Sequence, residues 1–261
     1  MGGRGSGSGG NPPQPPEPPQ PPTNEDPTQW SWDQVQNYIN AHPDDDDEAL
    51  TTKVEQWLAA HRSASTTTIK DDEMTAPEDF YSITVKNGIQ LLFTPGNERN
   101  AADTIIEMVI GFDTLPGRLK SEVATIIMAM QTSGDIVATA GTNDKNIVVY
   151  GGNPLSTGTT GHEAAHNLAL DLWGRSNPPH YAEGTDMYYE IQEQGLPVRS
   201  DYGDAIESGE PPVSAYGRTN DSEDFAEAVK MYVINRTQLQ QIAPRRYAVI
   251  HALMTNAGYR G

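Results

Sequence analysis

The chain has 261 residues, a formal net charge of −19 at pH 7 and no cysteine. The missing cysteines exclude disulfides, thiolate metal sites and a cysteine nucleophile, so any metal must be held by His, Asp or Glu. The acidic charge argues against nucleic acid and membranes as partners, because phosphate backbones and anionic lipids attract basic surfaces. The sequence has no apolar run of membrane-spanning length and no apolar signal core near its start. We therefore expect a soluble protein, cytoplasmic or exported by a non-classical route.

The N-terminal third divides into segments of different composition. Residues 1–28 are rich in Gly, Ser and Pro and include the run NPPQPPEPPQPP, which predicts a disordered arm with polyproline II character. Residues 29–62 carry apolar residues at helical spacing on both sides of an acidic run, which indicates a short helical hairpin. Residues 63–76 (SASTTTIKDDEMTA) are interpreted as a linker to a main domain at 77–261.

The main domain mixes strand and helix patterns, which indicates an α+β fold. The segment YSITVKNGIQLLF surrounds Asn87-Gly88, the strongest short signal of a β-hairpin. The segment SEVATIIMAM fits a strand as well as a helix. The other expected elements are a helix at 101–111, strands in DIVATAG and NIVVYGG, helices at 160–173 and 220–235, and a last helix in RRYAVIHALMTNAG.

The strongest motif is His162-Glu163-Ala164-Ala165-His166, in the expected helix at 160–173. Side chains four residues apart project from the same side of a helix, so the two imidazoles can bind one metal ion. Zinc suits this set, because it accepts imidazole and carboxylate and keeps a fourth position for water. Glu163 can act as the general base for that water. The motif therefore predicts a zinc-dependent hydrolase of peptide bonds.

Two questions stay open at the level of this motif. Thr160 could cap the helix and Glu163 could close a capping box, which would give both residues a purely structural role. The third ligand is also open, because Ala169 and Leu172 replace the glycine and the histidine of an HExxHxxGxxH continuation. The remaining candidates are the downstream acids Glu183, Asp186, Glu190 and Glu223.

A second motif lies in residues 214–228, SAYGRTNDSEDFAEA. Its YGRTN stretch and its ExFAEA helix start closely resemble the C-terminal catalytic domain of anthrax lethal factor. The Pro-Pro endopeptidases share its Tyr-to-Glu spacing, and the strand NIVVYGG is similar to the strand that precedes the active-site helix in that family. The resemblance extends over residues 80–261 and is sharpest at 146–166 and 214–228.

The resemblance implies a zincin-like metallopeptidase of the gluzincin type, with a small mixed sheet over an active-site helix and one zinc ion. It implies that Tyr216 stabilises the oxyanion or protonates the leaving group, which suits a phenol that stays neutral at pH 7. It also implies that Glu227, one helical turn after Glu223, accepts the free ring N–H of a ligand histidine. The metal ligands it implies are His162, His166 and Glu223, and the general base is Glu163.

The chain departs from the relatives between its two motifs. The stretch from His166 to Glu223 looks longer than in the relatives, and the loop near 174–212 is expected to border the cleft. Within it, EGTDMYYE resembles the GTxD element of aspartate-type zinc peptidases, which would make Asp186 the third ligand. Glu190 has a gluzincin-like spacing. We prefer Glu223, because Tyr216 and the rest of its motif accompany it.

The expected partner is a protein or peptide substrate. In such peptidases an edge strand above the metal pairs with the extended substrate backbone, as in strand addition generally. We assign this role to the strand formed by Ile147, Val148, Val149 and Tyr150. The alternative is a catalytically silent zincin-fold protein with a binding or regulatory role, against which the presence of both Glu163 and Tyr216 argues. The opening MGGRGSG resembles openings of bacteriophage-encoded proteins, so a phage or mobile-element origin would fit.

Overall fold

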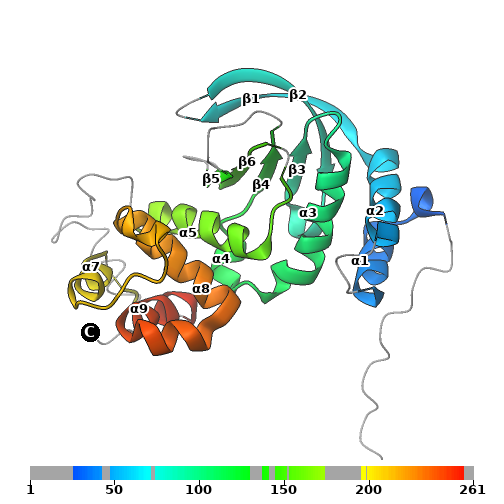
Figure 1. Ribbon diagram of the computed structural model, residues 1–261. Helices are drawn as coiled ribbons and strands as arrows, with labels where there is room; N and C mark the ends of the chain where they lie inside the picture. Colours follow the sequence, from blue (N-terminus) through cyan, green and yellow to red (C-terminus); the bar gives the residue numbers. More distant parts are fainter. Residues whose placement is uncertain are drawn as a thin grey trace, which may run out of the picture.

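The computed structural model has an α+β architecture, as expected, with helices packed around a six-stranded mixed sheet (Figure 1). The strand order is β1-β2-β3-β4-β6-β5. Within the described part of the chain, no helix combines the length and the apolar character that crossing a membrane requires. The structure describes residues 26–42, 48–71, 74–129, 137–140, 145–151, 153–173, 195–197 and 199–255, without the side chains of 66–71 and 74–78.

The helical hairpin expected near the N-terminus is confirmed. A 3-10 turn, η1 (Pro27–Gln29), leads into α1 (Trp32–Ala41), and α2 (Glu48–His61) follows. A capping box starts α1, in which Ser31 Oγ accepts from the backbone N–H of Gln34 and the Gln34 side chain accepts from the backbone N–H of Ser31. Both helices pack on α3 (Glu98–Gly111), so their apolar side chains join the main core.

The linker expected at residues 63–76 is wrong. The chain forms β1 (Ser63–Asp71) and β2 (Met74–Thr84), which pair antiparallel from Ser63↔Ser82 to Asp71↔Met74. The polar composition suggested a loop, but Ser and Thr can also line a ribbon whose backbone groups pair with each other, and β-branched Thr favours extended backbone. This ribbon curves over the sheet in Figure 1.

The hairpin expected at Asn87-Gly88 is confirmed. Asn87 and Gly88 have φ values of 57° and 79°, the left-handed conformation that a tight hairpin needs and that Asn and Gly tolerate best. The turn η2 (Lys86–Gly88) joins β2 to β3 (Gln90–Phe93). The two strands pair antiparallel, with Thr84 opposite Gln90.

The rest of the sheet is parallel except at its edge. The ambiguous segment SEVATIIMAM contains a strand, β4 (Thr125–Met128), which lies parallel to β3 and to β6 (Asn146–Val149). The edge strand β5 (Ala138–Ala140) runs antiparallel to β6. Between β3 and β4 come α3 and two short elements, η3 (Phe112–Thr114) and α4 (Gly117–Lys120).

The sheet separates two apolar clusters. The larger cluster lies where α3 and α5 (Thr157–Trp173) pack, and it includes Leu91, Ile126 and Ile147. The smaller one includes Phe80, Leu92, Ile127, Val148 and Tyr150, and its strand residues alternate along the chain with those of the first cluster. Because successive strand side chains point to opposite faces, the buried strands read as continuous apolar runs.

In the described C-terminal part, α8 (Asp221–Ile242) packs against α5, and α7 (Arg199–Glu207) and α9 (Pro244–Thr255) pack against α8 and each other. The short turn η4 (Tyr216–Arg218) precedes α8. We expected the helix to end at Asn235. The helical backbone does break there, with φ −154° and ψ 70°, but the Asn235 side chain caps the following turn by accepting from the backbone N–H of Gln238 at 3.1 Å. The helix therefore resumes and extends to Ile242.

Candidate metal centre

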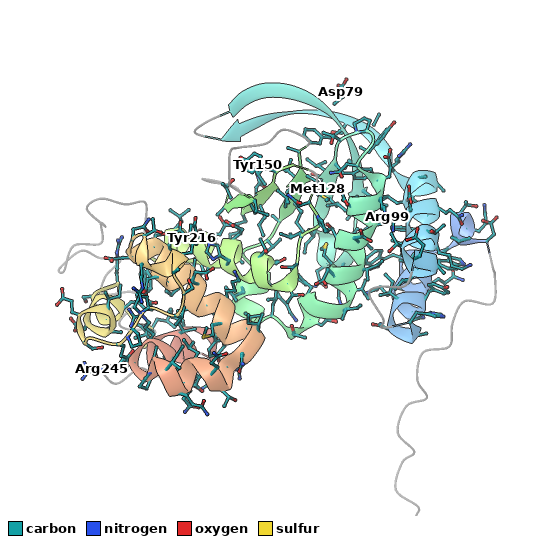
Figure 2. All side chains as sticks on the ribbon, in the orientation of Figure 1. Asp79, Arg99, Met128, Tyr150, Tyr216 and Arg245 are labelled. Atoms are coloured by element: carbon teal, nitrogen blue, oxygen red, sulfur yellow. The ribbon has the colours of Figure 1, made fainter. Side chains whose placement is uncertain are left out.

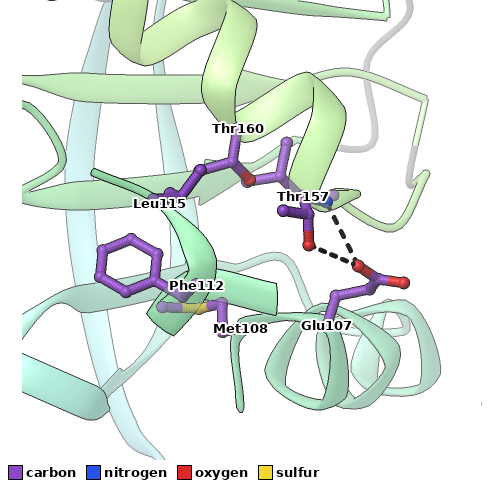
Figure 3. Close-up of a pocket in the computed structure, with 7 residues that line it drawn as sticks. Glu107, Met108, Phe112, Leu115, Thr157 and Thr160 are labelled. Atoms are coloured by element: carbon purple, nitrogen blue, oxygen red, sulfur yellow. Dashed lines mark hydrogen bonds between the residues drawn. The ribbon is translucent and has the colours of Figure 1, made fainter. Parts of the chain in front are cut away.

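The start of the helix that carries the histidines is held by side chains outside the motif. Ser156 Oγ accepts from the backbone N–H of Thr159 at 3.1 Å. Glu107 of α3 accepts from both the backbone N–H and the hydroxyl of Thr157, at 3.2 and 3.0 Å (Figure 3). Thr160 instead lies within the first helical turns, and its hydroxyl donates to the Ser156 carbonyl. The capping-box alternative for Thr160 and Glu163 is therefore wrong.

The helices α5 and α8 bring three expected ligands together. Asn220 caps α8 by accepting from the backbone N–H of Glu223 at 3.0 Å, which fixes the direction of the first turn. His162 Nε2 lies 3.2 Å from His166 Nε2. Glu223 Oε2 lies 3.2 Å from His162 Nε2 and 3.4 Å from His166 Nε2. The two imidazoles and the carboxylate therefore form a triangle of donor atoms.

The triangle has the dimensions of one face of a tetrahedral metal site. Donors bound to zinc at about 2.0–2.1 Å in tetrahedral geometry are separated by about 3.3–3.4 Å. The Oε2 atom of Glu223 is buried and has no aligned hydrogen-bond donor among the described residues, which is a costly state for a carboxylate without a cation. His162, His166 and Glu223 can therefore hold a metal ion.

The structure tests only one of the four candidates for the third ligand. Glu183, Asp186 and Glu190 lie outside the described residues. Glu223 occupies the third corner without them. Burial alone would raise the pKa of Glu223, but the nearby imidazoles of His162 and His166 outweigh it and bring the pKa to about 2. The carboxylate is therefore ionised at neutral pH, as a metal ligand must be.

Glu163 lies beside the triangle and has the environment of a general base. Its side chain is buried, and this desolvation raises its pKa to about 7, with a further contribution from the negative charge of Glu223. The charge of His166 and a hydrogen bond from the backbone of Ala140 in β5 lower the pKa of Glu163, but by less than burial raises it. A carboxyl group that titrates near neutral pH can both take up and release a proton.

Tyr216 stands at the edge of the same site. It lies in η4, its ring centroid is 5.9 Å from that of His162, and 56% of the residue is exposed (Figure 2). Burial raises the pKa of the phenol, and the carboxylates of Glu223, Glu163 and Glu227 raise it further. The hydroxyl therefore keeps its proton at neutral pH and can donate a hydrogen bond to a group bound at the triangle.

Each ligand histidine has a partner on its second ring nitrogen. Glu227 Oε1 lies 2.9 Å from His162 Nδ1, but the ring N–H is not aligned for the expected hydrogen bond. Lys230 donates to the same Glu227 oxygen at 3.1 Å. The Nδ1 atom of His166 lies 3.1 Å from Ser222 Oγ, a contact that sequence reasoning missed. The only sequence signal for Ser222 is its place directly before Glu223.

A buried ion pair, also missed from the sequence, holds the first turn of α8. Arg246 of α9 donates from Nε to Asp224 Oδ1 at 2.7 Å and from Nη2 to Oδ2 at 3.1 Å. The hydroxyl of Tyr202 in α7 donates to the same Oδ1 at 2.7 Å. All three residues are less than 5% exposed. Asp224 directly follows Glu223 in the chain. Its contacts with Arg246 and Tyr202 therefore connect the placement of that ligand to α9 and α7.

The substrate-binding strand expected at Ile147, Val148, Val149 and Tyr150 is wrong. This segment, β6, pairs with β4 on one side and with β5 on the other, so its backbone groups are not free. All four side chains are buried. The edge of the described sheet nearest to α5 is β5, whose Ala140 contacts Glu163.

Comparison with protein-family models, with curated proteins and with solved structures finds no match.

Proposed function

We propose that this protein is a zinc-dependent endopeptidase of the gluzincin type with a lethal factor-like site. The observation that carries the proposal is the triangle of His162 Nε2, His166 Nε2 and Glu223 Oε2, with edges of 3.2–3.4 Å and Glu163 beside it. Zinc bound there would polarise the scissile carbonyl and make a water molecule acidic enough to attack it near neutral pH.

The chain's own residues account for the remaining steps. Glu163 takes the proton of the attacking water and later delivers it to the leaving amine, a double role that its pKa of about 7 permits. Tyr216 donates a hydrogen bond to the oxyanion from its exposed position on the site's rim. Glu227 and Ser222 fix the orientation of the two imidazole rings.

The edge strand β5 is the part of the sheet suited to bind an extended peptide. Its outer backbone groups lie at the edge of the described sheet, and Ala140 connects it to the general base. A strand at the edge of a sheet can bind a peptide by adding it as a further strand. In this proposal the substrate backbone lies over α5, beside Glu163. The proposed substrate is therefore an extended protein segment.

The test is metal analysis and peptide-library cleavage with the wild type and Glu163→Ala. We expect about one zinc per chain in both proteins, because Glu163 is not one of the three ligands, and cleavage by the wild type alone. His162→Ala is the control that removes a ligand and should lose the metal. Absence of zinc from the wild type would overturn the proposal. Zinc in both proteins with cleavage by neither would favour a silent binding protein.

A further inference from the structure

A groove of about 430 Å³ lies between the N-terminal helices and the base of the β1–β2 ribbon. Three tryptophans line it: Trp30, Trp32 and Trp57. The rings of Trp32 and Trp57 are 5.6 Å apart and tilted, and the indole N–H of Trp57 donates to the Trp30 carbonyl at 3.0 Å. Trp30 and Trp57 are buried, whereas Trp32 is partly exposed. We call this feature the tryptophan groove.

Hydrogen-bond donors surround the aromatic surface of the tryptophan groove. The hydroxyls of Ser31, Ser63, Ser82 and Thr84 line it together with the Trp32 indole. In the described part of the chain, none of these five side chains donates a hydrogen bond to another residue. The lining contains no carboxylate, although the whole chain carries a net charge of −19. The groove is therefore suited to an uncharged ligand that is apolar and rich in acceptors.

A proline-rich segment has these properties. Proline has no backbone N–H, so such a segment presents carbonyl acceptors without matching donors. Polyproline II leaves these carbonyls free, because the conformation has no internal hydrogen bonds. Aromatic-lined grooves bind such segments by packing the proline rings, and the preformed helix loses little entropy. Residues 11–22 of this chain (NPPQPPEPPQPP) carry a single charge, at Glu17.

We propose that residues 11–22 bind in the tryptophan groove of their own chain. The described chain starts at Asp26, which caps η1 and leads directly to Trp30 in the groove. Residues 23–26 (Thr-Asn-Glu-Asp) include turn-forming types, so the arm can reverse its direction there. A short tether gives an effective concentration in the millimolar range, at which even a weak polyproline contact is populated. The N-terminal helices α1 and α2, beside which the tryptophan groove lies, are at the end of the molecule away from α8 (Figure 1).

The absence of cysteine makes a specific spin-label experiment possible in the full-length chain. A nitroxide at Gln14→Cys is the only label, and the four tryptophans report through their indole N–H signals in NMR spectra. We expect Trp32 and Trp57 to lose most of their signal intensity. Trp173, whose indole donates to the Pro197 carbonyl, is the internal control and should keep its intensity.

The matched control keeps the label and the length of the arm but replaces the prolines within 15–22 by serine. It should restore most of the Trp32 and Trp57 intensity, because a flexible tether remains while the polyproline ligand is lost. Trp32→Ala should restore the Trp57 signal, and an unshifted Trp173 signal would show that the fold persists although a partly buried side chain is lost. Equal broadening with the serine arm would overturn the proposal. Broadening of an isotope-labelled chain by a separate nitroxide-carrying chain would also overturn it, in favour of binding between two copies.

Discussion

The two helices that supply the metal donors are held in place by different kinds of contact. Helix α5 is set by its own caps, by Glu107 and by apolar packing under the sheet. The first turn of α8 is set by its Asn220 cap and by the buried pair Asp224–Arg246, which recruits Tyr202. The histidine pair is therefore encoded within one short motif, whereas the position of the third donor depends on residues far along the chain.

The largest expected effect is a loss of kcat in a variant that keeps both helices and the metal. Glu163→Gln keeps the shape of the side chain but removes the base, so kcat should fall by about 10²–10⁴-fold. Zinc content and the unfolding midpoint should not fall, because Glu163 is not a ligand and a neutral amide removes the cost of burying its charge. Peptide cleavage assays and metal analysis on the same sample check both expectations. Wild-type activity in this variant would refute the assigned base.

The contrast between the helices is tested most strongly at Asp224. Asp224→Ala removes the closest partner of the buried Arg246, which keeps its Nη1 contacts with Glu210, so the free energy of unfolding should fall by about 3–5 kcal/mol in denaturant titrations. Zinc affinity should fall as well, because the first turn of α8 loses its anchor. The matched control is Glu48→Ala, which breaks the ion pair of Glu48 with Arg99 on the exposed surface and should change neither quantity measurably. An Asp224→Ala protein with wild-type stability would show that the pair does not hold the helix.

Tyr216→Phe tests the rim of the site without touching either helix core. Loss of an oxyanion donor typically lowers kcat by about 10²–10³-fold, and we expect a loss in that range with little change in KM. The side chain is exposed, so zinc content and stability should stay at wild-type values. Steady-state kinetics separate kcat from KM. A rise in KM alone would assign Tyr216 to substrate binding instead.

Gly111→Ala tests the packing that sets α5. A Cβ atom at Gly111 would lie 1.7 Å from Thr157 Oγ1, so α3 and the start of α5 must separate. We expect a loss of about 1–3 kcal/mol in the free energy of unfolding. Gly117→Ala is the matched control, because a Cβ there meets no described atom within 4 Å. Equal stability of the two variants would contradict the close packing of the two helices.

The smallest expected effect concerns the outer contact of His162. Glu227→Gln removes the charge that faces Nδ1, and zinc affinity should fall by about 10–100-fold, as is usual for such partners. The fold should persist, since the other contacts of Glu227 are with the partly exposed Lys230 and with Ser214, and an amide oxygen can still accept from both. Competition with a zinc chelator measures the change. Unchanged zinc affinity would show that Glu227 does not act on the metal site through His162.

Local sequence signals predicted the elements on which the site is built. Asn87-Gly88 predicted its hairpin, and the spacing of His162 and His166 predicted a shared helix face, because both depend on neighbouring residues. The ribbon at 63–84 was missed, since strand pairing gives Ser and Thr a structure that their polarity does not reveal. The Asp224–Arg246 pair was missed because its partners meet only through the tertiary fold.

The edge of the sheet shows the same limit. NIVVYGG has the pattern of a buried strand, but the sequence does not reveal which strand has a free edge. Pairing with β5 places β6 in the interior, and the short segment Ala138–Ala140 takes the edge. Strand order depends on contacts between distant segments, so the wrong strand was assigned to the substrate.

The most direct test of the central claim is a crystal structure of the zinc-loaded protein with anomalous scattering measured at the zinc edge. The account predicts one strong peak, within bonding distance of His162 Nε2, His166 Nε2 and a Glu223 carboxylate oxygen. A peak that lies away from the two imidazoles, or one in which Asp186 or Glu190 replaces Glu223, would contradict it.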